Sequence, residues 1–189
     1  RGRRISTDMK IIPLAIPGVL RIEERVFHDE RGSFAETYRQ SVFDAAVGRP
    51  VVFVQDNYSR STRNVLRGLH YQVEQPQGKL LRVTEGSVFD VVVDLRRSSP
   101  TFGHWIAETL SADNRRQLWI PEGLAHGFLV LSEHASVAYK ASAYYAPEHQ
   151  RCLAWNDPTL SIEWPLDTDP ILSVADRLGA ELPNADCFP

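Results

Sequence analysis

Cysteine is scarce in this chain of 189 residues, which carries only Cys152 and Cys187. Two cysteines cannot form a framework of several disulfides, nor the four-cysteine ligand set of a zinc ribbon. We therefore interpret both residues as free thiols, as is typical of proteins in the reducing cytoplasm.

Long apolar runs and an excess of positive charge are also missing. The apolar segment IIPLAIPGVL, at residues 11–20, is too short to span a bilayer and contains two prolines. The 21 Lys and Arg residues are outnumbered by 24 Asp and Glu residues, and the formal net charge of −3 leaves no electrostatic footprint for nucleic acid. We expect neither a membrane nor a nucleic-acid partner, whereas a local basic patch for a phosphate-bearing small molecule stays compatible with this charge.

The chain begins with the basic octapeptide RGRRISTD, ahead of Met9. No small-residue cleavage site of a signal peptide follows it, so we expect no signal peptide. We interpret residues 1–8 as an added remnant or a disordered segment. The length of the remainder suits one domain. We expect residues 9–189 to form a single domain, with a C-terminal tail that packs on it.

Short extended segments dominate residues 51–145. They include VVFVQDNYS, NVLRGLHYQ, GKLLRVTEG and SVFDVVVDL, separated by Gly, Pro, Ser and Asn. Many short strands with regular turn signals indicate an all-β sandwich or barrel. We predict an all-β jelly-roll, cupin-like barrel with a few short, mostly peripheral helices. Helices are predicted at residues 41–48, with Ser41 as N-cap and Gly48 as the stop, and around SVADRLG at residues 173–179.

A metal-binding histidine pair is missing from an otherwise suggestive motif. The segment WIPEGLAHGF contains Pro-x-Gly-x-x-His, ending at His126, as in cupins. A metal site of that class needs His-x-His and a carboxylate, but His70 is followed by Tyr71 and Gln72. Two imidazoles alone make a poor site, so we expect no bound metal and no cofactor. A metal-dependent cupin enzyme is kept as an alternative hypothesis.

His70 lies in a strand pattern that also contains cations, since Arg67 precedes it and Lys79 follows after a short turn. A lone strand histidine is usually a core residue with its hydrogen bonds satisfied. Here, however, a tyrosine-rich strand, VAYKASAYY, follows at residues 137–145. A histidine can act as a general base, a lysine can stabilise an oxyanion, and a tyrosine can return a proton. Together these residue types favour proton abstraction beside a carbonyl, with an enolate intermediate.

Regular alternation would place Arg67 and His70 on opposite faces of their strand. Gly68 lies between them, and we predict an irregularity there that turns both side chains to one side.

By the same alternation, Asp90 shares a face with Val88, Val92 and Asp94. That face is either solvated or turned to a cavity near His126, and we include Asp90 among the candidate substrate-binding residues.

An ordered set of segments resembles the dTDP-4-dehydrorhamnose 3,5-epimerases of deoxysugar biosynthesis. The segments lie between residues 25 and 176 and are FHDERGSFAETY, FVQDNYS, VLRGLHYQ, PQGKLLRV, VFDVVVDLRRSSPTFG, QLWIPEGLAHGF, YKASAYY and WNDPTLSIEWP. The resemblance implies a metal-free, cofactor-independent jelly-roll homodimer. It also implies inversion of carbons 3 and 5 of dTDP-4-dehydro-6-deoxy-D-glucose, which gives dTDP-4-dehydro-L-rhamnose.

The resemblance further implies roles for individual residues. The family's base falls on His70, its carboxylate partner on Asp176, its proton donor on Tyr139, and the lysine near the carbonyl oxygen on Lys79. The residues that resemble nucleotide-sugar binders are Phe27, Arg31, Glu36, Gln55, Asn57, Arg67, His126 and Tyr145. Ala175 stands where the family often has lysine, so the contacts with the diphosphate are expected to differ.

Other hypotheses stay open beside the double epimerase. Related enzymes of antibiotic-sugar pathways invert a single carbon on much the same frame. A non-catalytic module that binds nucleotide sugars is a further alternative, although base, acid and carboxylate candidates occur together here.

Overall fold

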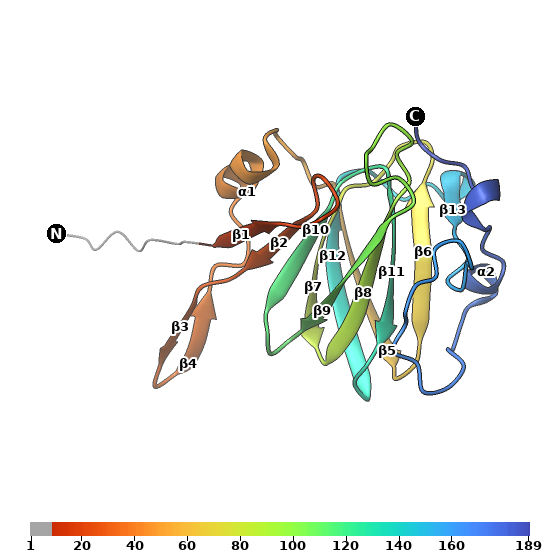
Figure 1. Cartoon of the computed structure of the whole chain (residues 1–189). Helices are drawn as coiled ribbons and strands as arrows, with labels where there is room; N and C mark the ends of the chain where they lie inside the picture. The colour runs from red at the N-terminus through yellow and green to blue at the C-terminus, as the bar shows by residue number, and fades with distance from the viewer. Residues whose placement is uncertain (1–8) are drawn as a thin grey trace.

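The chain forms thirteen β-strands and a few short helical segments, in a computed structural model that describes residues 9–189 (Figure 1). The strands are β1 (Lys10–Pro13), β2 (Leu20–Glu23), β3 (Val26–Asp29), β4 (Gly32–Ala35), β5 (Gln55–Thr62), β6 (Leu66–Gln72), β7 (Lys79–Glu85), β8 (Ser87–Asp94), β9 (Trp105–Ser111), β10 (Arg116–Ile120), β11 (Leu124–Val130), β12 (His134–Ala141) and β13 (Gln150–Cys152). The helices are α1 (Gln40–Val47) and α2 (Val174–Arg177), with 3-10 turns η1 (Pro147–His149) and η2 (Leu182–Asn184). The interpretation of residues 1–8 lies outside the described residues.

Two antiparallel sheets pack face to face. The six-stranded sheet has the order β1-β2-β10-β7-β12-β5, and the five-stranded sheet has the order β13-β6-β11-β8-β9. Strands β3 and β4 pair only with each other and form a hairpin that projects from the sheets (Figure 1). The predicted all-β jelly roll with few short helices is confirmed, in an open form whose two sheets are not closed into one barrel by hydrogen bonds.

The main apolar core lies between the two sheets. Its members come from both sheets and include Leu81, Val88, Val92, Leu118, Phe128, Val130 and Val137. The other face of the five-stranded sheet is also buried, because Leu69, Val91 and Val93 pack against residues of the C-terminal segment such as Leu153 and Leu160. Since both faces of β8 are covered, five of the eight residues in its sequence SVFDVVVD are apolar, and its two aspartates need a specific explanation.

Helix α1 packs on the outer face of the six-stranded sheet. Its buried residue, Phe43, meets Trp119 edge-on with ring centroids 5.1 Å apart, a contact that stabilises by about 0.5–1.5 kcal/mol beyond the area it buries. The helix ends as predicted, because Gly48 adopts the left-handed φ of 81°. Its predicted start was wrong, since Arg39 occupies the N-cap without a side-chain cap bond and Ser41 lies inside the helix. The helix therefore begins without a serine cap, and the buried Phe43 holds it on the sheet.

Residues 51–54 are not part of a strand, contrary to the prediction for VVFVQDNYS, and β5 begins only at Gln55. Val51 is buried beside Phe43, and its N–H donates to the Asp44 carboxylate at 3.0 Å. Residues 51–54 are therefore held by contacts with α1 before the chain enters the sheet. Helix α2 agrees with the predicted position around residues 173–179. Neither α1 nor α2, nor any other helix within residues 9–189, is long and apolar enough to cross a membrane.

Strand β6 is irregular at Gly68, as predicted. On the neighbouring β11, His126 is opposite His70 and Phe128 is opposite Arg67, so β6 has one extra residue between these pairs. Because residues opposite each other in a ladder point to the same side, both Arg67 and His70 point to the inner face between the sheets. Gly68 has a φ of 111°, and a Cβ at this position would lie 2.6 Å from the carbonyl oxygen of His126. The close approach of the two backbones thus requires glycine.

The C-terminal segment covers the outer face of the five-stranded sheet and pairs with its edge. Strand β13 pairs with β6 in a register that places Cys152 opposite His70. Asp157 is 2% exposed and accepts hydrogen bonds from backbone N–H groups of Thr159, Leu160 and Leu182. These bonds hold the returning chain so that α2 lies beside β6 (Figure 1).

Gly68→Ala is expected to lower the free energy of unfolding by about 3 kcal/mol or more, because it combines positive-φ strain with backbone overlap. Gly32→Ala is the matched control, since Gly32 also has a positive φ, of 124°, but nothing lies within 4 Å of an added Cβ. The control should lose only about 1–2 kcal/mol. Chemical denaturation measures both values, and equal losses would contradict this account of the irregularity.

Candidate active site

Charged and polar side chains interrupt the apolar face between the sheets. The five-stranded sheet contributes Arg67 and His70 from β6, Asp90 from β8 and His126 from β11, and the six-stranded sheet contributes Lys79 from β7 and Tyr139 from β12. Asp90 and His126 occupy positions whose alternate neighbours are core residues, which are Val88 and Val92 on β8 and Leu124 and Phe128 on β11. Both sheets therefore place ionisable groups in the space between them.

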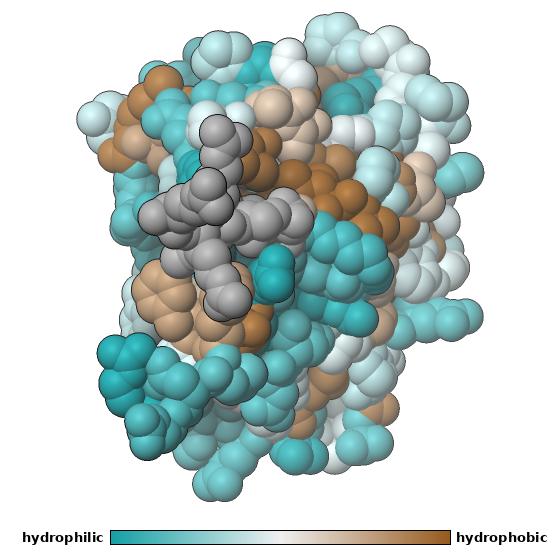
Figure 2. All heavy atoms as spheres, turned by 90° about the vertical axis from the view of Figure 1, so that its left-hand side faces the viewer, coloured by the Kyte–Doolittle hydropathy of each residue, from teal (hydrophilic) through white to brown (hydrophobic). Residues whose placement is uncertain are grey.

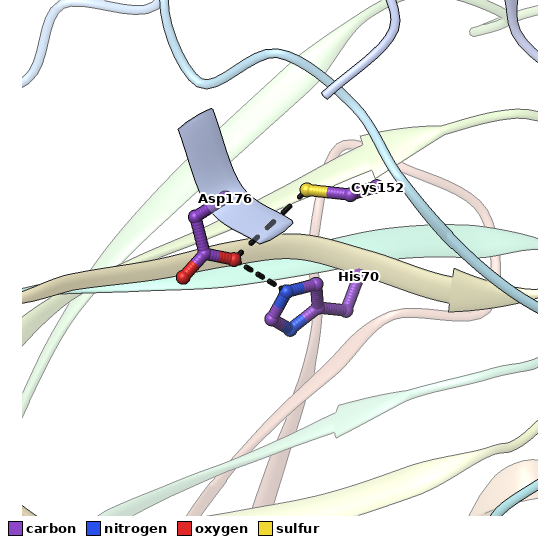
Figure 3. Close-up of side chains that lie close together, drawn as sticks. All are labelled: His70, Cys152 and Asp176. Carbon is purple, nitrogen blue, oxygen red and sulfur yellow. Dashed lines mark hydrogen bonds and ion pairs between the residues drawn. The ribbon is translucent and has the colours of Figure 1, made fainter. Parts of the chain in front are cut away.

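His70 forms a hydrogen-bonded pair with Asp176 (Figure 3). The distance between His70 Nε2 and Asp176 Oδ1 is 2.6 Å, and the carboxylate side chain is only 4% exposed. Asp176 also accepts hydrogen bonds from the Gly68 N–H at 3.3 Å and from the Ser173 hydroxyl at 2.7 Å. Burial alone would raise the pKa of Asp176, but the hydrogen bonds from His70 and Ser173 outweigh it, and the pKa lies below the ordinary value. The site thus holds a fixed negative charge behind an imidazole.

The orientation of the His70 ring leaves one nitrogen available for chemistry. Since a carboxylate accepts hydrogen bonds, Nε2 carries the proton and Nδ1 keeps its lone pair. In Figure 3 the ring presents Nε2 to Asp176, and Nδ1 points away from it. The side chain is 31% exposed, so a ligand can reach the ring. This arrangement suits a general base whose protonated form is stabilised by the carboxylate.

A second imidazole–carboxylate pair lies deeper between the sheets. His126 Nε2 donates to Asp90 Oδ2 at 2.8 Å, and Asp90 is fully buried. The other carboxylate oxygen, Oδ1, has no hydrogen-bond partner among the described residues. Burial raises the pKa of Asp90, and the interactions with His126 and Lys79 act in the opposite direction. Asp90 and His126 therefore lie close together, as expected, and both side chains belong to the inner face between the sheets.

Lys79 and Tyr139 approach the same face from the six-stranded sheet. Burial lowers the pKa of Lys79 to about 8, and the negative charge of Asp90 opposes this shift. The Lys79 Nζ lies 5.9 Å from the centroid of the Tyr139 ring. Burial raises the pKa of Tyr139, while the charge of Arg67 acts in the opposite direction. The Lys79 cation and the protonated Tyr139 phenol therefore lie close together. The Arg67 side chain is held separately, because its Nε donates to the Ser61 hydroxyl at 3.0 Å.

Three further expected residues meet at one end of this face. The Gln55 side-chain amide donates to Asn57 Oδ1 at 2.9 Å, and Gln55 Oε1 accepts from the Tyr145 N–H at 2.9 Å. The Tyr145 side chain is left free to meet a ligand, since the residue is 53% exposed.

A protein-family model for dTDP-4-dehydrorhamnose 3,5-epimerase matches residues 13–184. The chain belongs to this family. The dTDP-4-dehydrorhamnose 3,5-epimerase of Pseudomonas aeruginosa is 61% identical over 181 residues, covering 96% of this chain and 100% of that protein. The enzyme of the same name from Shigella flexneri is 54% identical over 181 residues, covering 95% and 99%.

Solved epimerase structures share the fold. The dTDP-6-deoxy-D-glucose-3,5-epimerase of Legionella pneumophila, in complex with dTDP-4-keto-L-rhamnose, has a TM-score of 0.92 and 47% identity, covering 95% of each chain. A 3′-monoepimerase of Streptomyces bikiniensis, in complex with dTDP-quinovose, has a TM-score of 0.86 and 35% identity, covering 90% of this chain and 87% of its own. The expected family and the cupin-like jelly roll are confirmed.

Three of the expected substrate-binding residues of this epimerase lie apart from the others. Phe27, Arg31 and Glu36 lie on or beside the β3–β4 hairpin, which projects away from the two sheets (Figure 1). The Arg31 guanidinium pairs with Asp29 at 2.6 Å, and the Glu36 carboxylate pairs with Arg39 at 2.6 Å. Within one chain, these residues are not brought together with His70.

Sequence reasoning missed two residues that support the epimerase site, Ser173 and Ser61, and one that only lies beside it, Cys152. Ser173 caps α2 and holds Asp176, a role that a serine three positions before an acidic residue could have indicated. Ser61 holds Arg67 from β5, which belongs to the other sheet, and no local pattern points to it. Cys152 has its Sγ 4.0 Å from Asp176 Oδ1, and burial raises the pKa of its thiol to about 12. Only the pairing of β13 with β6 brings Cys152 there.

Asp90→Asn is expected to lower the pKa of Lys79 further below about 8, because the carboxylate charge that favours the ammonium is lost. Lys10, Lys79 and Lys140 are the lysines of the chain, so the Lys79 side-chain carbon signal can be assigned and titrated by NMR. Asp56→Asn is the control, since Asp56 pairs with the exposed Lys140 at 3.1 Å. An unchanged Lys79 titration in Asp90→Asn would contradict the described coupling.

Proposed function

We propose that the protein epimerises dTDP-4-dehydro-6-deoxy-D-glucose at carbons 3 and 5, giving dTDP-4-dehydro-L-rhamnose. The observation that carries this proposal is the His70–Asp176 pair on the inner face of a chain of this family. Both carbons flank the ketone at carbon 4, which acidifies their protons. The proposed chemistry needs no cofactor, because the substrate itself supplies this activation.

In the first step, His70 Nδ1 accepts the proton from the carbon beside the ketone. The ring then carries a positive charge next to Asp176, whose pKa is low enough for it to remain a carboxylate. Asp176 therefore stabilises the imidazolium and keeps the ring in a fixed orientation. Its Nε2–H bond holds the base in the required tautomer before the reaction begins.

Negative charge then develops on the ketone oxygen as the enolate forms. Lys79 is the proposed partner of this oxygen, because a buried ammonium stabilises an oxyanion more strongly than one in water. A lysine is charged below its pKa, so Lys79 acts as a cation below pH about 8 and loses this charge as the pH rises further. Asp90, by favouring the ammonium, keeps Lys79 charged near neutral pH.

Reprotonation on the opposite side of the carbon completes each inversion. Tyr139 is the proposed acid, because its raised pKa keeps it protonated and it lies on the sheet opposite His70. The same base and acid can serve both carbons in turn if the sugar ring reorients between the steps. The nucleotide end supplies binding energy that holds the sugar in place, for which Gln55, Asn57, Arg67, His126 and Tyr145 are the proposed contacts.

A homodimer completes the proposed site. The β3–β4 hairpin places Arg31 away from the inner face of its own chain, so Phe27, Arg31 and Glu36 can serve a site only in a second copy. Apolar side chains gather on the side of the molecule that carries α1 and the hairpin (Figure 2). Phe34, Val52 and Tyr58 are 70%, 65% and 64% exposed. Such exposure suits a covered interface. We place the dimer in the cytoplasm, in line with two free thiols.

Inversion of a single carbon is the second candidate function. The observation that favours it is the similarity to the Streptomyces bikiniensis 3′-monoepimerase, at 35% identity. A single-centre enzyme would use the same base and reprotonate only one carbon from the opposite side.

The test of the proposed function is proton NMR of the keto-sugar with the protein in deuterated water. Deuterium should enter at both carbons 3 and 5, whereas exchange at one carbon alone would support the single-centre alternative. His70→Ala should slow this exchange by about 10²–10⁴-fold, because the base is removed. His104→Ala, in an exposed loop, is the control and should exchange normally. Near-normal exchange in His70→Ala would remove His70 as the base.

Tyr139→Phe is expected to separate proton removal from product formation. The base remains in this variant, so deuterium exchange should continue, while formation of the inverted product should fall by about 10²-fold or more because the acid is lost. The ratio of exchange to product, followed by NMR over time, measures the effect. Tyr144→Phe is the control, since Tyr144 is 65% exposed. Equal losses of exchange and product in Tyr139→Phe would contradict the role of the acid.

Mixed dimers test the proposed contribution of the hairpin. Arg31→Ala and His70→Ala should each impair activity, but co-expressed chains should form heterodimers in which one site has both residues. With equal amounts, half of the dimers are mixed and half of their sites are intact, so about a quarter of the wild-type activity should return. Activity no greater than the sum of the two single variants would show that the hairpin does not serve a second copy.

A further inference from the structure

Three potential metal ligands from different elements converge behind the His70 ring. They are the Nε2 of His70 on β6, the Sγ of Cys152 on β13 and the Oδ1 of Asp176 on α2, all within 4.8 Å of one another (Figure 3). In Figure 3, the carboxylate oxygen lies between the thiol and the imidazole, with a contact to each. Nitrogen, sulfur and oxygen donors at this separation form a compact donor set.

The surrounding structure holds these three groups in place. Cys152 lies directly opposite His70 in the β13–β6 ladder, so its position is fixed by backbone pairing. Asp176 is fixed by Ser173 and by the Gly68 N–H. The thiol is half-buried, and its nearest polar neighbours are the Leu153 carbonyl oxygen, at 3.4 Å, and Asp176. The proposed epimerisation uses the His70 and Asp176 side chains and leaves the thiol without a task.

We infer that His70, Cys152 and Asp176 form a binding site for a thiophilic divalent cation such as Zn²⁺, which inhibits the enzyme. Zinc binds cysteine, histidine and carboxylate at about 2.0–2.3 Å in a tetrahedron, which separates neighbouring ligand atoms by about 3.3–3.7 Å. The 2.6 Å contact between His70 Nε2 and Asp176 Oδ1 must therefore widen by only about 1 Å. The half-buried thiol moves inward by a similar amount, and a water molecule supplies the fourth ligand.

The charges and protons can be accounted for when the cation binds. The Cys152 thiol loses its proton to solvent and becomes a thiolate, as any thiol ligand of zinc does. The proton on His70 Nε2 moves to Nδ1, because the metal takes the Nε2 lone pair. Two positive charges of the metal then meet one thiolate and one carboxylate, which leaves a neutral site.

The inhibition follows from the side of the ring that the metal occupies, and this step rests on the proposed function. With the metal on Nε2, Nδ1 carries a proton and has no lone pair with which to accept another. A metal held by these three groups would lie on the Nε2 side of the ring, and Figure 3 shows that Nδ1, the proposed base, points away from that side. Substrate binding should therefore persist while proton abstraction stops, so Zn²⁺ should lower kcat and leave KM nearly unchanged.

Cobalt(II) provides a test that does not depend on catalysis, because a cobalt–thiolate bond gives a charge-transfer absorption band. Wild-type protein and Cys187→Ser, the matched cysteine control, should show this band with one cobalt per chain, and Zn²⁺ should remove it. Cys152→Ser should show no band, and Cys152→Ala provides a second variant should the serine disturb folding. No band in the wild-type protein, or the same band in both Cys152 variants, would overturn the metal site.

Steady-state kinetics then tests the inhibition. Zn²⁺ should reduce kcat of the wild-type protein and of Cys187→Ser at least about 10-fold at saturation, with recovery after a chelator. Cys152→Ser should keep its activity and resist the same Zn²⁺ concentration. Inhibition that raises KM alone, or that is equal in Cys152→Ser, would overturn the inference. A cobalt band in a protein that shows no epimerisation would instead contradict the proposed function and leave the metal site standing.

Discussion

The hydrogen bond between His70 Nε2 and Asp176 Oδ1 is the interaction on which the rest of the site depends. It joins a strand of the five-stranded sheet to a helix that follows more than a hundred residues later, with a separation of 106 positions. A carboxylate that is 4% exposed is stable as an anion only if its lone pairs are satisfied. The imidazole, a serine hydroxyl and a backbone N–H satisfy them here. In the proposed mechanism, the tail of the chain is thus part of the catalytic apparatus, because its Asp176 fixes the tautomer of His70.

Two imidazole–carboxylate pairs occur in the same sandwich, and their environments separate their roles. The pKa of Asp176 is lowered because hydrogen bonds outweigh its burial, whereas the pKa of Asp90 is raised because burial outweighs the attraction of His126 and Lys79. His70 lies near solvent, and His126 is 10% exposed. The His70–Asp176 pair therefore suits proton transfer with a ligand. The His126–Asp90 pair suits orientation and charge balance for Lys79.

Much of the fold and part of the site could be predicted from the sequence. The alternation of apolar and polar residues, together with the turn residues, indicated the strands. Regular alternation would have placed Arg67 and His70 on opposite faces, and this located the irregularity at Gly68. Other features depend on tertiary contacts that leave no local pattern. Residues 51–54 pack against α1 instead of joining the sheet, because the Asp44 carboxylate accepts a hydrogen bond from the Val51 N–H. Asp176 was found only through family resemblance, and Cys152 only through the ladder of β13 and β6. The hairpin residues were assigned to the site only from the family pattern, and within one chain they do not lie beside His70.

The most direct measurement of the central claim is a double-mutant cycle between His70 and Asp176. The rate of deuterium exchange into the keto-sugar would be compared for wild type, His70→Ala, Asp176→Asn and the double variant. If Asp176 acts through His70, the double variant should be about as slow as His70→Ala alone, within about 2-fold, because the carboxylate has no imidazolium left to stabilise. Rate losses that multiply in the double variant would mean that the two side chains act independently, which would contradict the account.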